Sequence, residues 1–188
     1  MRALGLLAAG LVTLGASTAS AAESEHGPFY VQASPLGTSV VFYPGSTVTV
    51  GSLTYSTGGA LGFYRVDAEF GYHFSGRADG FTLGLRQAFL LGWGSAGITS
   101  LRAGYDIPIK IGDEMELLIG PYAHAGALYG FNGGDAYFSF GLGGDGKMFF
   151  SRDLGLYAFL RPFELGMNVG SGPLVAQLSF AGGLGWAF

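Results

Sequence analysis

Hydrophobic residues alternate with small or polar residues along most of the chain, and this period of two is typical of β-strands. The clearest example covers residues 64–74, where every even-numbered position is aromatic or aliphatic. The odd-numbered positions of this stretch include four titratable residues: Arg65, Asp67, Glu69 and His73. The pattern therefore predicts a strand with one apolar face and one charged face.

The same alternation recurs in segments that are separated by glycine, proline and short polar residues. It predicts eight strands, at residues 47–55, 61–75, 81–91, 98–109, 114–129, 137–149, 154–169 and 174–188. In the seventh segment the apolar positions change parity near Arg161 and Pro162, which predicts a β-bulge there. Such a bulge would keep both Arg161 and Glu164 away from the apolar face.

The last segment has the strongest contrast between its two faces. Its even-numbered positions, from Leu174 to Phe188, are mostly large and apolar, whereas its odd-numbered positions are mostly small. A strand of this kind faces an apolar medium on one side and packs closely on the other, as strands of membrane barrels do.

Composition indicates that the apolar faces meet a membrane. Hydrophobic residues make up 49% of the chain and charged residues 12%, whereas charged residues make up about 25% of a typical soluble domain. Beyond the amino terminus, no segment approaches the ~20 unbroken apolar residues of a membrane helix. Because backbone groups in lipid must be paired within the protein, we expect an all-β fold, an antiparallel up-and-down transmembrane β-barrel of about eight strands.

The amino terminus has the pattern of a secretory signal peptide. Arg2 precedes an apolar segment, and the small residues Ala19 to Ala21 follow it, which predicts a signal peptide at 1–21 with cleavage after Ala21. Residues 22–45 contain two short apolar runs around Pro35, and we expect an arm, a lid or an extra short hairpin there. The barrel is expected to cover residues 46–188, and a count of ten strands stays open.

The alternating segments and the terminal aromatic residue resemble those of small bacterial outer-membrane β-barrel proteins of the OmpA/OmpX-like kind. The resemblance implies an integral protein of the cell outer membrane, with the lipid bilayer, periplasmic chaperones and the barrel assembly machinery as partners. It also implies that the charged turns are periplasmic and the short glycine-rich loops external. The assembly signal would consist of Phe180, Leu184, Trp186 and Phe188.

The residues predicted to face inward carry charges of both signs, and nine of them form the candidate site: Arg65, Asp67, Glu69, Arg86, Arg102, Asp106, Glu116, His124 and Glu164. Buried charges are tolerated when they are paired and hydrogen-bonded, so we expect a packed, mutually neutralising network with a structural role in the envelope. The alternative is a porin-like channel for small solutes that these groups line.

Other chemistries have less support in the sequence. His73 and Ser75 resemble the His-x-Ser pair of lipid A 3-O-deacylases, which are barrel enzymes, but we expect them at the periplasmic end and predict no enzymatic activity. The scattered histidines have no metal-ligand spacing, and we expect no cofactor. Neither the net charge of −4 nor the basic residues indicate nucleic acid. Six aromatic residues are expected in the interface girdles: Trp93, Tyr129, Phe131, Phe149, Tyr157 and Trp186.

Overall fold

The computed structural model describes residues 26–43, 45, 47–50, 53–56, 58–92, 95–111, 115–130, 136–151, 154–170 and 174–188. The predicted signal peptide lies outside the described residues, as do Trp93 and Phe131. Among the described residues, no helix has the length and apolar character needed to cross a membrane.

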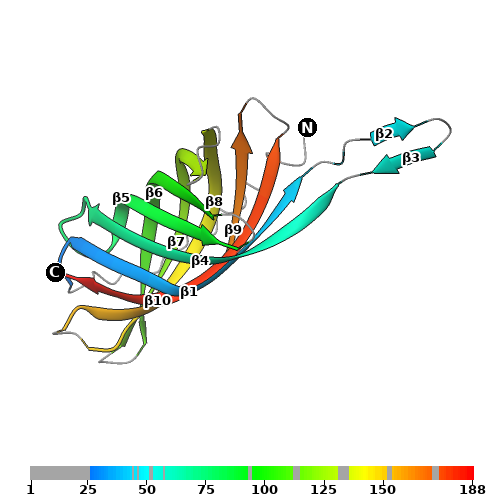
Figure 1. Ribbon diagram of the computed structural model, residues 1–188. Coiled ribbons are helices and arrows are strands. Elements are labelled where there is room, and N and C mark those ends of the chain that lie inside the picture. Colours follow the sequence, from blue (N-terminus) through cyan, green and yellow to red (C-terminus); the bar gives the residue numbers. More distant parts are fainter. Residues whose placement is uncertain are drawn as a thin grey trace, which may run out of the picture.

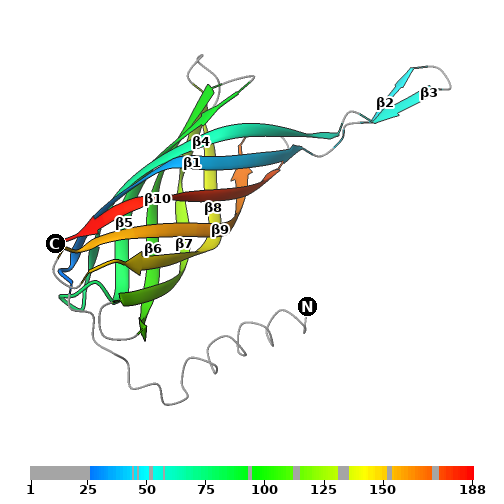
Figure 2. The ribbon, with the colours of Figure 1, turned by 90° about the horizontal axis from the view of Figure 1, so that it is seen from below.

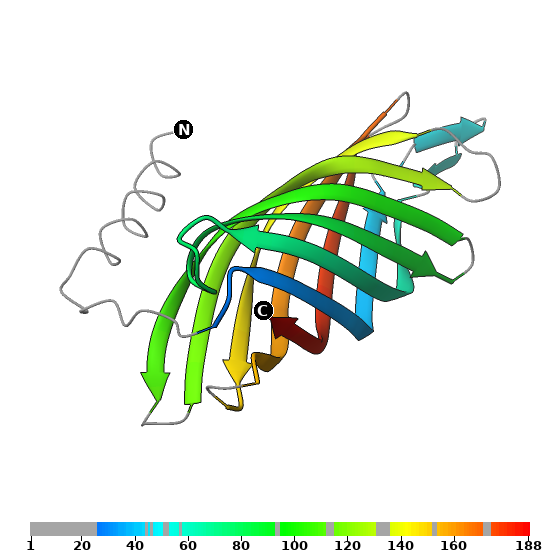
Figure 3. The same cartoon turned by 90° about the vertical axis from the view of Figure 1, so that its left-hand side faces the viewer.

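Eight antiparallel strands form a closed barrel, as the sequence predicted (Figures 1 and 3). In barrel order they are β1 (Phe29–Tyr43), β4 (Gly59–His73), β5 (Gly80–Leu91), β6 (Ser95–Ile111), β7 (Met115–Gly130), β8 (Tyr137–Phe149), β9 (Leu156–Val169) and β10 (Val175–Ala187). Strands β1 and β10 pair along the seam that closes the wall. Seven of the eight predicted strands therefore match wall strands to within a few residues.

The prediction for the first strand was wrong, because β1 lies within the segment 22–45 that was expected outside the barrel. A register shift at Pro35 splits β1 into two short runs whose outward residues have opposite parity. The sequence therefore shows no single alternating run as long as a membrane strand. Proline is tolerated there because it has no N–H to donate to a ladder. The Ser34 hydroxyl stabilises the shift by donating to the carbonyls of Leu36 (3.2 Å) and Gly182 (3.0 Å).

The segment 47–55 is not a wall strand either. It forms most of a separate two-stranded hairpin of β2 (Thr47–Val50) and β3 (Leu53–Ser56), which projects beyond the barrel between β1 and β4 (Figure 2). Valine and threonine favour strands locally, and the pattern alone does not distinguish a hairpin from a wall strand. The expectation that the external loops are short was therefore wrong for the connection between β1 and β4.

The two faces of the wall agree with the predicted alternation. Phe70, Leu101 and Leu165 are more than half exposed on the outer wall, while Arg65, Arg102 and Glu164 are buried in the lumen. The bulge in β9 is confirmed, since the register shifts in this region. Pro162 and Phe163 are both exposed, so that Arg161 and Glu164 both face inward.

The barrel has two distinct rims. The rim that we call the terminal rim holds His26, Phe188 and the connections β4–β5, β6–β7 and β8–β9. Phe29 and Phe188 pair there through both backbone N–H groups, at 3.1 and 2.8 Å. The opposite rim, the hairpin rim, holds the β2–β3 hairpin and the connections β5–β6, β7–β8 and β9–β10.

Candidate functional site: the charge-paired lumen

All nine residues of the predicted network lie inside the barrel and are buried, with exposed fractions from 0 to 8%. They come from β4, β5, β6, β7 and β9, because period-two alternation turns every second residue of each strand inward. The structure thus places all nine inside the barrel, and their role depends on the contacts described next.

Glu164 organises the cluster nearer the hairpin rim. Its carboxylate accepts hydrogen bonds from Arg65 Nη1 (2.8 Å), from Arg86 and from the Tyr122 hydroxyl (2.6 Å). His124 Nε2 lies 3.6 Å from the same carboxylate. Three strands besides β9 are thus tied to one anion at the centre of the lumen.

Arg161 and Arg102 organise a second cluster beside the first. Arg161 pairs with Asp67 (2.8 Å) and with Asp145 (2.9 Å). Arg102 pairs with Glu69 (2.7 Å) and with the other oxygen of Asp145 (2.8 Å). Each of these ions has partners on different strands, so the ion pairs cross the lumen and connect opposite parts of the wall.

The network continues toward the terminal rim through Asp106. This carboxylate accepts a hydrogen bond from Lys147 and lies 2.8 Å from Nε2 of His73. Nearer the rim, His26 Nε2 lies 3.9 Å from Glu116, and the His26 ring stacks on Phe149 at a centroid distance of 3.9 Å. The three histidines are therefore distributed along the lumen, each beside a different carboxylate.

Tyrosine rings fill the space between the ion pairs, and inward glycines make room for them. A Cβ on Gly143 would lie 2.4 Å from the Tyr122 hydroxyl, and one on Gly71 would lie 2.3 Å from the Tyr30 ring. Tyr122 also packs under the Arg102 guanidinium, at 4.0 Å from its ring centroid. These glycines therefore serve close packing, as the small inner faces of the strands predicted.

The central layer balances its charges. It contains five cations (Arg65, Arg86, Arg102, Arg161 and Lys147) and five anions (Asp67, Glu69, Asp106, Asp145 and Glu164), each at most 5% exposed. Apolar clusters lie on both sides of it: one around Tyr157 and Phe149 toward the terminal rim, and one around Leu90 and Ile98 toward the hairpin rim. The described part of the lumen is thus a filled core.

Sequence reasoning missed three members of this layer. Asp145 and Lys147 fall within the predicted strand 137–149 and belong to β8, but they were not included among the inward residues because the glycine-rich run before them shows little alternation. Because Phe140 and Leu142 point outward, the odd-numbered positions of β8, which include Asp145 and Lys147, face inward. The predicted bulge already implied that Arg161 points away from the lipid, but Arg161 was not included among the predicted site residues.

The predicted girdle location was also wrong for two of the aromatic residues. Phe149 and Tyr157 are 1% exposed and lie inside the barrel, where the Tyr157 hydroxyl donates to Gln32 (3.1 Å). Both occur near strand ends, as girdle residues do, but their parity is inward. Trp186 is 52% exposed on the outer wall, and Tyr129 is half-buried there, with its hydroxyl 3.2 Å from the Gln87 side chain.

His73 and Ser75 do not meet. The ring nitrogens of His73 lie at hydrogen-bonding distance from Asp106 and from the Pro28 carbonyl (3.1 Å). The Ser75 hydroxyl donates to the carbonyls of Arg77 (3.1 Å) and Asp79 (2.7 Å) within the exposed β4–β5 turn. The hydroxyl is therefore engaged in the turn and is not activated by the histidine, as a nucleophile would be.

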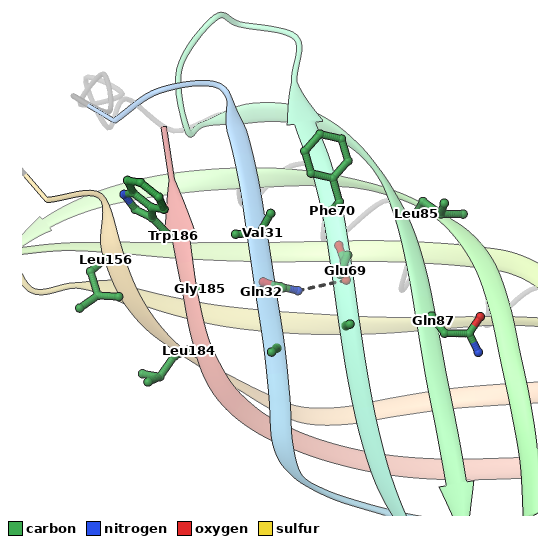
Figure 4. Close-up of a pocket in the computed structure, with 12 residues that line it drawn as sticks. Val31, Gln32, Glu69, Phe70, Leu85, Gln87, Leu156, Leu184, Gly185 and Trp186 are labelled. Atoms are coloured by element: carbon green, nitrogen blue, oxygen red, sulfur yellow. Dashed lines mark hydrogen bonds between the residues drawn. The ribbon is translucent and has the colours of Figure 1, made fainter.

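The outer wall carries two hollows. One, of about 540 Å³, crosses β9, β10, β1, β4 and β5 nearer the terminal rim, between side chains such as Trp186 and Phe70 (Figure 4). The other, of about 640 Å³, crosses β7, β8, β9, β10 and β1 nearer the hairpin rim. Both are lined mainly by side chains that point away from the lumen.

No protein-family model and no curated protein matches the chain. Among solved structures, it is similar to Neisserial surface protein A, with 14% identity, a TM-score of 0.53, and coverage of 85% of this chain and 97% of that one. Two further matches are the outer membrane protein OprG from Pseudomonas aeruginosa (11% identity, TM-score 0.43, coverage 88% and 98%) and Ail of Yersinia pestis (13% identity, TM-score 0.36, coverage 87% and 99%). The similarity to Neisserial surface protein A agrees with the closed eight-stranded antiparallel barrel of this chain.

Proposed function

We propose that this chain is an integral outer-membrane barrel whose lumen is a closed, charge-paired core, and that it has a structural role in the envelope without enzymatic activity. The observation that carries the proposal is the central layer of ten balanced charges, each at most 5% exposed. A hydrated pore needs charged side chains in contact with water, whereas these side chains contact one another.

The outer wall supports the location in a membrane. Large apolar side chains are exposed around the barrel, among them Leu101 (58%), Leu142 (64%) and Leu160 (62%). A soluble protein rarely exposes a continuous apolar surface of this extent, whereas lipid covers such a surface favourably. The resemblance to small outer-membrane barrels favours the bacterial outer membrane, with the terminal rim facing the periplasm.

The last strand is proposed to carry the assembly signal. Phe180, Leu184, Trp186 and Phe188 are 42 to 59% exposed on one outward face of β10 and the residue after it. This arrangement leaves the four side chains accessible to the assembly machinery before the wall is surrounded by lipid. Replacing Phe188 by Ser should lower the amount of barrel in the outer membrane without changing the stability of the refolded protein.

Conductance across a planar bilayer tests the closed lumen. The mature chain is refolded, its folding is verified by heat-modifiable gel migration, and single-channel currents are recorded. We expect a folded species with no discrete conductance steps. Salt-dependent steps from the folded species would overturn the closed core and favour the small-solute channel, with Arg86 and Glu164 among its selectivity determinants.

A further inference from the structure

A short segment before β1 crosses the mouth of the barrel at the terminal rim. Residues 26–28, which we call the strap, precede the strand pairing of β1, which begins at Phe29. The strap starts beside β1, yet Nε2 of His26 lies 3.9 Å from Oε2 of Glu116 on β7. In the closed wall β7 is the fourth strand from β1 in both directions, so it lies on the opposite side of the barrel. The strap therefore spans the whole opening.

The tip of the strap is docked through His26, which is 5% exposed. Its ring stacks on Phe149 of β8, with the centroids 3.9 Å apart and the planes inclined by 11°. Its carbonyl accepts a hydrogen bond from the N–H of Ala78 (3.0 Å) in the β4–β5 turn. Ala78 is 1% exposed, although its neighbour Arg77 is exposed. The strap thus covers Ala78 and the Phe149 ring from the side of the rim.

The base of the strap has the geometry of a hinge. A Cβ on Gly27 would lie 2.1 Å from the carbonyl carbon of Phe188, so only glycine lets the chain turn inward past the carboxyl end. The Pro28 carbonyl accepts a hydrogen bond from the backbone N–H of His73 (2.8 Å), which fixes this end of the strap to β4. A movement of the tip would therefore turn about Gly27 while Pro28 stays in place.

An apolar cluster lies directly beneath the strap. It includes Leu118, Phe149 and Tyr157, each at most 1% exposed, and it separates the strap from the central layer of charges. These residues belong to wall strands, so they would keep their places if the tip of the strap moved away. An undocked strap would present their aromatic surface to water, while the charged layer below would still close the lumen.

We propose that the strap is a hinged lid and that His26 is its latch, so that release of His26 opens the aromatic cluster to the periplasm. The proposal rests on the closed lumen and on the orientation of the terminal rim proposed above. The latch consists of a ring stack, one backbone hydrogen bond and a contact with a carboxylate, whereas the wall is held by continuous strand ladders. Segments with few contacts open at a much lower free energy than the core does. The lid thus controls access to the lumen from one side only.

Thiol labelling tests the latch, because the chain has no cysteine of its own. Ala78→Cys places a thiol beneath the strap, and Ser75→Cys places one on the exposed part of the same turn as a reference. The mature chain is refolded in detergent micelles, its folding is verified by heat-modifiable migration, and its rate of reaction with a charged maleimide is measured. His26→Ala is then combined with Ala78→Cys. The matched control is His124→Ala, which removes an equally buried ring nearer the hairpin rim.

We expect the thiol of Ala78→Cys to react at least about tenfold more slowly than that of Ser75→Cys. Adding His26→Ala should raise the rate about fivefold or more, whereas His124→Ala should change it by less than about twofold. Phe149→Leu removes the stacking ring, should act like His26→Ala, and serves as the second variant if His26→Ala does not fold. Equal rates with and without the latch, or an equal increase with His124→Ala, would overturn the lid. Conductance steps from the original protein would instead overturn the closed core.

Discussion

Removing the charge of Glu164 is the most direct test of the charge-paired core. Glu164 is 2% exposed and accepts hydrogen bonds from Arg65, Arg86 and Tyr122. In Glu164→Gln, Arg65 keeps its bond to Asp67, whereas Arg86 loses the carboxylate to which both of its Nη atoms donate. Breaking a buried ion pair by removing one partner costs about 3 to 5 kcal/mol.

The cost can be measured by equilibrium urea unfolding of the barrel in lipid vesicles, followed by tryptophan fluorescence and by heat-modifiable migration. A loss of 3 to 5 kcal/mol corresponds to roughly two to three and a half orders of magnitude in the folding equilibrium. Lys110→Gln is the control, because it removes a charge from an exposed side chain at the end of β6 and should change stability by less than about 0.5 kcal/mol.

A double variant separates charge pairing from simple loss of packing. Arg86→Met combined with Glu164→Gln removes both partners of the Arg86–Glu164 ion pair. The double variant should therefore recover part of the stability that Glu164→Gln loses, with a coupling energy of about 0.5 to 3 kcal/mol. A Glu164→Gln cost below about 1 kcal/mol, or additive effects in the double variant, would refute the reasoning. Either result would mean that the lumen charges are hydrated.

Three further predictions follow from the wall and the lumen. Phe70→Arg on the outer wall should cost about 2 to 4 kcal/mol in vesicle unfolding if Phe70 lies near the bilayer midplane; an unchanged midpoint would contradict the outward assignment. Gly143→Ala places a methyl group against Tyr122 and should cost about 1 to 3 kcal/mol; a Tyr122→Phe background tests whether the loss depends on the hydroxyl contact. Asn168 is 1% exposed, and neither side-chain polar atom has a hydrogen-bond partner among the described residues. Asn168→Leu should therefore raise the free energy of unfolding by about 1 kcal/mol, and a loss of stability would indicate a partner such as bound water.

Much of the barrel could be predicted from the sequence because period-two alternation is a local property. Once the apolar face of a strand is identified, the opposite face must point inward, which placed Arg102, Asp106 and His124 correctly. Alternation does not reveal which charges form pairs, because Arg65 and Glu164 lie far apart in the chain and meet through the curvature of the wall. Pairing required the three-dimensional structure.

The errors occurred where alternation is interrupted or absent. The register shift at Pro35 reverses the parity of β1 and made one long strand resemble two short ones. The run Gly141 to Gly146 has few side chains to alternate, so the inward positions of Asp145 and Lys147 were not recognised. In both places the backbone adapts to its neighbouring strands, and this adaptation depends on residues from other parts of the chain.

The β1–β10 seam has a consequence for the order of events during folding. Every other neighbouring pair in the wall joins consecutive barrel strands, whereas the seam joins the first strand to the last. Before β10 is in place, the sheet would have two open edges, and each unpaired backbone group on them would cost several kcal/mol in hydrocarbon. A partly built wall therefore cannot persist in the bilayer. Seam closure and passage into the lipid should occur as one cooperative event, with the hairpins between consecutive strands forming earlier, outside the hydrocarbon.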